Sequence, residues 1–162
     1  MGKRRISTVK RQTRSGWQKG KSRGERGGKP IRRRLAAAIV AEYRARERLG
    51  GPVSIFAKSE PGVEKTYAAI LKAVSKFGDV RAEEKKTSIH LCAKTGFAGV
   101  HPRKSAVLLN IRSAAPIKSR RIRKVKRVSA NRFHNEMLLQ SPKDVDAEVT
   151  GWLKDAYALG IG

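Results

Sequence analysis

Three histidines and a single cysteine are the side chains of this 162-residue sequence that could take part in nucleophilic chemistry. His90 and Cys92 are two residues apart, so on a strand they would point to the same face. A thiolate beside an imidazole can act as a nucleophile. However, H-x-C is not the spacing of a zinc site, and a free cysteine is usually buried. We therefore expect Cys92 to be structural, with no catalytic residue, no metal and no cofactor.

The other two histidines lie among basic residues. An anion site could be formed by His101, Arg103, Lys104, Arg132 and His134. Such a site would belong to a domain that binds a small anionic ligand or acts on one. The alternative is an ordinary solvated basic surface, and the sequence leaves both open.

The motifs that identify common enzyme classes are missing from the sequence. It contains no G-x-x-x-x-G-K-[ST] phosphate loop, no serine nucleophile elbow, no H-E-x-x-H and no paired C-x-x-C. The sequence therefore names no reaction, and we expect a protein that is not an enzyme.

The charge balance points to an anionic partner. Lysine and arginine number 38 against 13 acids, which gives a formal net charge of +25. Such an excess opposes compaction by self-repulsion, and binding to a polyanion would relieve it. Nucleic acid, either DNA or RNA, is the first candidate, and an anionic membrane surface is the second.

The sequence also indicates where the protein acts. No apolar run approaches the ~20 residues that span a bilayer, and no apolar segment follows the basic N-terminus as in a secretory signal. Glycines in the first 28 residues would break the amphipathic helix of a transit peptide. We therefore expect a cytoplasmic protein without a membrane partner.

Basic residues concentrate in two stretches, Lys3 to Arg34 and Lys118 to Arg127. Dense basic blocks are typical of interaction tails, and an aromatic residue within one can stack on a base. The alternatives are a solvated extension for the first stretch and a charge-protected edge strand for the second. The predicted nucleic-acid-binding residues are Lys3, Arg4, Arg5, Lys10, Arg11, Arg14, Trp17, Arg32, Arg33, Arg34, Lys118, Arg120, Arg121, Arg123 and Lys124.

Composition divides the chain into a disordered basic arm over 1–29, a helix and linker over 30–51, and an α+β domain over 52–162. The spacing of apolar residues predicts a helix over Pro30 to Leu49 and another from Ser59, which Gly78 ends. Asp79 to Glu84 reads as a charged edge strand.

Alternation over Thr87 to Arg112 predicts an antiparallel β-meander, with a positive φ at Gly96 and a strand end at Pro102. Two further strands are expected. The first spans Lys118 to Arg127, where buried aliphatic residues would anchor a charged ridge, and the second spans Phe133 to Leu139.

A C-terminal helix is predicted to begin at Ser141 and to end at Gly160. Asp144, Asp146 and Glu148 cluster at its start. Acids at a helix N-terminus are stabilised by the helix macrodipole, so we prefer this explanation to a metal site. The predicted fold is therefore an antiparallel meander packed by an N-side helix and this C-terminal helix. A third functional hypothesis is an interaction module that forms a homodimer through a sheet edge or the first helix.

Several motifs together resemble a known family. They are F-A-G-V-H-P-R-K over 97–104, R-I-R-K-V over 121–125, R-F-H over 132–134, and a tail from Leu138 to Tyr157 that contains S-P-K-D-V-D. In order and spacing they resemble the uncharacterised bacterial domain of unknown function 5655. The resemblance implies a compact helix, sheet and C-terminal helix, and it implies no reaction. Some relatives carry a Cys-rich ribbon where this chain has its basic arm.

Overall fold

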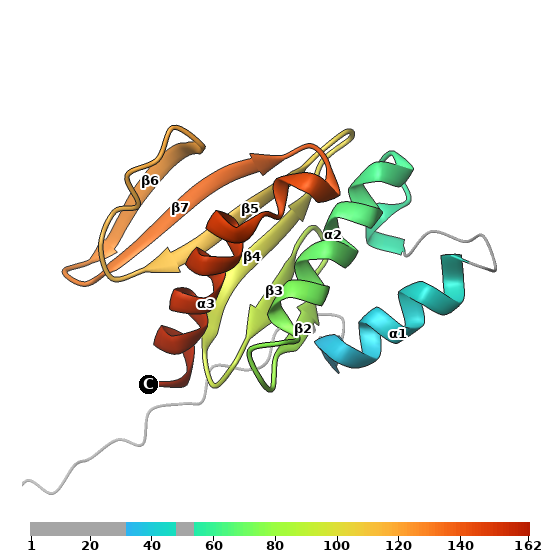
Figure 1. Ribbon diagram of the computed structural model, residues 1–162, viewed down its shortest axis with the longest axis horizontal. Coiled ribbons are helices and arrows are strands. Elements are labelled where there is room, and N and C mark those ends of the chain that lie inside the picture. The colour runs from blue at the N-terminus through green and yellow to red at the C-terminus, as the bar shows by residue number, and fades with distance from the viewer. Residues whose placement is uncertain (1–31, 48–53) are drawn as a thin grey trace, which may run out of the picture.

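A seven-stranded antiparallel sheet organises the protein, and helices α2 and α3 pack on one of its faces (Figure 1). The structure is a computed structural model that describes residues 32–47 and 54–162. The predicted disordered arm over 1–29 lies outside the described residues. The α+β class is confirmed, as are helices on the N-terminal side of the sheet and at the C-terminus.

The strands lie in the order β1-β2-β3-β4-β5-β7-β6. Their bounds are β1 Arg32–Leu35, β2 Arg81–Glu84, β3 Ile89–Cys92, β4 Gly96–Pro102, β5 Val107–Ser113, β6 Ile122–Ser129 and β7 Arg132–Leu139. The helices are α1 Ala36–Glu47, α2 Pro61–Val74 and α3 Ala147–Ile161, with short 3-10 helices η1 Ser54–Phe56 and η2 Pro142–Asp144.

The core lies between the sheet and the two long helices. Alternate residues of each central strand point to the same face, so Val107, Leu109 and Ile111 of β5 are all buried. Tyr67 of α2 and Leu153 of α3 are buried against that face. The apolar periods read from the sequence therefore assign the correct side of β5, α2 and α3 to the core.

The predicted meander is confirmed as β3, β4 and β5, which pair in succession, and β4 ends at Pro102. The expected positive φ at Gly96 is wrong. Among the described residues the glycine with a positive φ is Gly78, at +135°. A register shift between Leu91 and Cys92 lets the chain turn without a left-handed residue.

The first part of the predicted helix over Pro30 to Leu49 is wrong, because Arg32–Leu35 form strand β1. The backbone of β1 pairs antiparallel with β2, with Arg32 in register with Glu84 and Arg33 with Glu83. Helix propensity is a weak preference that such pairing overrides. Strand β2 is consequently internal, and the prediction that it forms a sheet edge is also wrong.

The other edge is β6, and the chain reaches it by passing the position that β7 later fills. Buried Asn135 of β7 fixes this crossover. Its Nδ2 donates to the Ile111 carbonyl at 3.2 Å and to Ser113 Oγ at 2.7 Å, and its Oδ1 accepts from the Ile117 amide at 3.0 Å. The amide side chain therefore joins β5, β7 and the crossover loop.

The C-terminal helix begins later than predicted. Ser141 and Asp144 form a capping box around η2, and α3 starts only at Ala147 with Asp146 as its N-cap. The helix does not end at Gly160 but continues to Ile161. The Ser-Pro-Lys-Asp signal is thus a real cap, although of a single 3-10 turn.

We expect Gly78→Ala to lower the free energy of unfolding by about 1–3 kcal/mol, because φ is +135° and a Cβ would lie 2.5 Å from the Tyr157 hydroxyl oxygen. Gly62→Ala is the matched control, since nothing lies within 4 Å of its Cβ position in α2. Alanine should be neutral or stabilising there. Denaturant unfolding of both variants tests this, and equal stability of the two would contradict it.

Candidate functional site

Strand β6 presents basic side chains on both of its faces. Every residue from Arg123 to Ser129 is exposed. We call Arg123, Lys124, Lys126 and Arg127 the basic ridge. Strand β6 lies at the edge of the sheet (Figure 1), and no acid interrupts the ridge, so this edge is positively charged.

The prediction that buried aliphatic residues anchor this strand is wrong for two of the three. Val125 is 43% exposed and Val128 is 48% exposed, and only Ile122 is packed against the core. Along its length the ridge is therefore held by its backbone ladder with β7 and not by apolar packing. On the core-side face of this pair, the Arg127 guanidinium lies 5.9 Å from the centroid of the Phe133 ring, in cation–π range.

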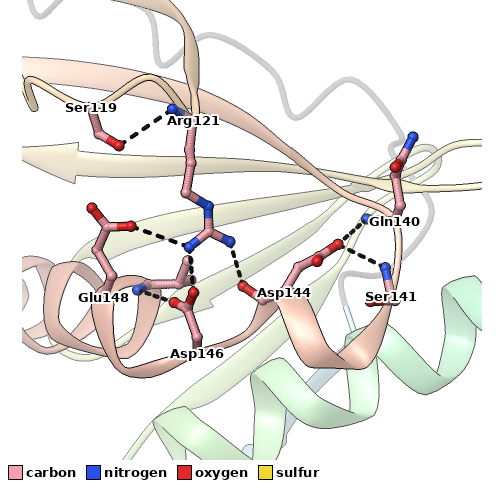
Figure 2. Close-up of polar contacts among 8 residues, drawn as sticks. Ser119, Arg121, Gln140, Ser141, Asp144, Asp146 and Glu148 are labelled. Atoms are coloured by element: carbon pink, nitrogen blue, oxygen red, sulfur yellow. Dashed lines mark hydrogen bonds and ion pairs between the residues drawn. The ribbon is translucent and has the colours of Figure 1, made fainter.

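Arg121 fastens the start of the ridge strand to the beginning of α3 (Figure 2). Its Nη1 lies 2.7 Å from Asp146 Oδ2 and 3.3 Å from Glu148 Oε2, and its Nη2 donates to the Asp144 carbonyl at 2.6 Å. These contacts occupy the guanidinium within the molecule. The structure thus gives Arg121, predicted from sequence as a nucleic-acid contact, an anchoring role.

The three acids near the start of α3 serve as caps and ion-pair partners. Asp144 Oδ2 accepts from the amides of Gln140 and Ser141, and Asp146 Oδ1 accepts from the Val149 amide (Figure 2). The Val149 hydrogen bond and the charge of Arg121 lower the pKa of Asp146. In the described part of the chain, no group of three or more His, Cys, Asp or Glu residues is placed to hold a metal.

The side of the sheet opposite to α2 and α3, here called the open face, carries all three histidines. His90 lies on β3, His101 on β4 and His134 on β7, each partly exposed and each pointing away from the core residues of its strand. Asn110 of β5 and Glu136 of β7 face each other on the same surface. The sequence could show that His90 and Cys92 share a face, but not that the pairing of β3, β4, β5 and β7 brings His101 and His134 to the same face.

Each histidine on the open face has a lowered pKa. Burial is the largest cause for all three. Positive neighbours lower each pKa further, Lys85 at His90 and Arg103 at His101. At His134 the positive neighbours are Arg132, Lys126 and Arg112, and Glu136 raises the pKa.

The predicted anion site does not converge as a whole. His101 lies opposite Leu108 whereas His134 lies opposite Arg112, so the two histidines are offset by four residues along β5, about 13 Å. The His101 ring also leans over Gly99, with its Nε2 3.4 Å from where a Cβ would be.

Arg103 and Lys104 belong to a tight turn outside the sheet. The Arg103 amide donates to Ala106 and the Lys104 carbonyl accepts from Glu60 before α2. The predicted set therefore splits into two places, with Arg103 near His101 and Arg132 near His134.

The remaining predicted residues fall into three groups. Cys92 is buried, in agreement with a structural role. Lys118 and Arg120 are exposed in the crossover loop before β6, and Arg34 is paired with Glu42 of α1. The predicted contacts of the arm from Lys3 to Trp17 lie outside the described residues.

Sequence reasoning missed Arg112 and Lys126 as neighbours of His134. Arg112 is the direct partner of His134 on β5, and Lys126 is its direct partner on β6. The row Arg112, His134 and Lys126 appears only when the three strands are paired. The sequence does not show this pairing, because β7 lies between β5 and β6 although it follows β6 in the chain.

Comparisons with known proteins give one match. A family model described as Domain of unknown function (DUF5655) matches residues 53–160. No curated protein and no solved structure matches the chain. Within the described residues, the helices are too short or too polar for any of them to cross a bilayer.

We expect Asp146→Ala to lower the free energy of unfolding by about 1 kcal/mol at neutral pH, because the Val149 amide loses its cap. The folded-state pKa of Asp146 is lowered, so the stabilisation by its charge is complete above the unfolded-state pKa of about 4 and disappears as the pH falls through the folded value. Denaturant unfolding at neutral and acidic pH measures both parts.

Asp146→Asn is the matched control for this experiment. Its amide oxygen can still accept from the Val149 amide, whereas the charge attraction to Arg121 is lost. The asparagine variant should therefore lie between wild type and alanine at neutral pH. Identical unfolding of the alanine variant and wild type would show that the cap contributes nothing.

Proposed function

The chain belongs to the DUF5655 family, whose description names no activity, and from this premise we propose that it binds nucleic acid without catalysis. The binding surfaces are the basic N-terminal arm and the basic ridge of β6. Chemistry on the partner is not part of the proposal, because His101 and His134 do not converge and Cys92 is buried.

The observation that carries the proposal is the exposure of the whole ridge. Arg123 to Ser129 are exposed on both faces of an edge strand, where an ordinary strand would bury one face. Exposed charge on an edge also blocks sheet-to-sheet pairing, which accounts for a few lysines. Protection of the edge does not, however, require a run of arginine and lysine that already begins with Lys118 and Arg120 in the preceding loop.

The shape of this region suits a nucleic acid. Strands β6 and β7 form an antiparallel ribbon at the end of the sheet, and a two-stranded ribbon fits the major groove of B-DNA. Basic side chains on such a ribbon contact phosphates, which gives affinity that depends on salt and hardly on sequence. The fourteen basic residues up to Arg34, against the single acid Glu25, would add to the same electrostatic attraction.

The test is a titration of a double-stranded oligonucleotide at several salt concentrations. The variant Arg123→Gln, Lys124→Gln, Arg127→Gln removes three ridge charges and leaves Lys126 in place. If each contacts one phosphate, the slope of log K against log salt should become shallower by about 2–3 units. Deleting Met1 to Lys29 should reduce the slope further.

A charge-matched control uses the helical side of the molecule. Lys65 and Lys72 of α2 and Lys154 of α3 are exposed, and their replacement by glutamine removes the same three charges. The control should bind nearly as well as wild type if the ridge is the interface. Equal losses in the two triple variants would reduce the effect to net charge, and no binding by wild type in dilute buffer would reject the proposal.

A further inference from the structure

We infer that Arg112, His134 and Lys126, with Arg132 beside them, form a site on the open face for a phosphate group of the nucleic-acid backbone. The inference rests on the proposed function and assigns it to a specific surface and chemical group. It places contact with the partner on the face of the sheet as well as on its β6 edge.

The register of three strands carries this inference. Arg112 of β5 and Lys126 of β6 lie directly opposite His134, one on each side of β7. Residues paired in this way point to the same face, with Cα atoms about 4.5–5.5 Å apart. Arg132 precedes His134 by two residues on β7 and so lies on that face as well. Four groups that can carry positive charge therefore share one corner of the open face.

The distribution of acids makes this corner different from the rest of the face. In the next row along the strands, Asn110, Glu136 and Lys124 are paired in register, so a carboxylate sits between an amide and an ammonium group. The row through His134 has a cation on each side instead. Like charges placed opposite each other destabilise a sheet, and a bound anion would remove that cost.

Arg112 is also held from the β4 side of β5, across the strand from His134, by Thr95 of the turn between β3 and β4. Its Nη1 donates to Thr95 Oγ1 at 3.0 Å, and the same hydroxyl donates to the Gly160 carbonyl at the end of α3 at 3.4 Å. The bond takes one of the five N–H groups of a guanidinium. An arginine fixed at one corner loses less entropy when its planar fork binds a phosphate.

His134 reports the occupancy of the site. The groups that face it are Arg112 on β5, Lys126 on β6, and Arg132 and Glu136 on its own strand. Burial and the three cations lower its pKa, and Glu136 raises it. A phosphate in the row would offset the cations and raise the pKa. Affinity should therefore increase as the pH falls, because the protonated imidazole adds a charge and a donor.

The experiment follows the ring signals of the three histidines by NMR during pH titrations of the full chain. Sulfate, whose charge is constant in this range, is compared with chloride at equal ionic strength. Sulfate should raise the pKa of His134 more than chloride does. His90 is the internal control, because three strand spacings, about 14 Å, separate β3 from β7. The extra shift should disappear in Arg112→Gln and in Lys126→Gln.

A second arm uses single-stranded oligothymidylate, whose phosphodiesters and bases keep their charge over the same range. Its affinity should rise between mildly alkaline and mildly acidic pH by up to about tenfold for each unit by which it raises the pKa of His134. His134→Gln should flatten this dependence, whereas His90→Gln should leave it unchanged. Both substitutions are at partly exposed positions, and circular dichroism verifies the fold.

The outcomes separate this inference from the proposed function. If the oligonucleotide binds in a salt-dependent way but neither sulfate nor oligothymidylate raises the pKa of His134, the inference is overturned and the ridge alone is the interface. If sulfate shifts His134 but no oligonucleotide binds, the nucleic-acid backbone is overturned as the occupant. The site is supported if sulfate and oligothymidylate both raise the pKa of His134 and if this rise is lost in Arg112→Gln and in Lys126→Gln.

Discussion

The position of the basic ridge depends on the guanidinium of Arg121. Strand β6 has no hydrophobic face of its own beyond Ile122, and its positive charges repel one another. Arg121 compensates by binding two carboxylates and a backbone carbonyl at the start of α3, where they are already organised by caps. Each exposed ion pair contributes little alone, but several contacts on one side chain share a single loss of rotamer freedom. The strand that carries most charge is thereby tied to the element that closes the core.

The two faces of the sheet are used differently. One face buries aliphatic residues against α2 and α3, and the other leaves histidines, Asn110, Glu136 and basic residues partly in water. Antiparallel sheets tolerate this division because alternate residues face opposite sides. Buried Asn135 lies on the core side of β7, where its three hydrogen bonds set the path of the crossover. A polar group this deep is stable only because all its partners are present.

The periodicity of apolar residues correctly predicted the elements that pack through a regular apolar face. Ile89, Leu91 and the alternate residues of β5 were assigned to the core correctly, and Ser141 and Asp144 do form a cap. The errors arose where a distant partner decides. Arg32–Leu35 became a strand because its backbone pairs with distant β2, and Val125 stayed exposed because the core does not extend to its place on the outer strand of the sheet. Neither partner is visible within a local window of sequence.

The amino-acid sequence by itself determined the class of the fold, the excess of positive charge and the two stretches that carry it, because composition and periodicity are properties of the chain. Only the tertiary structure decided which charged side chains are paired within the protein and which basic side chains lie next to one another. It turned Arg121 inward to α3, and it placed Arg112 and Lys126 on either side of His134. The physical reason is strand register: side chains from three strands become neighbours only when β7 is inserted between β5 and β6.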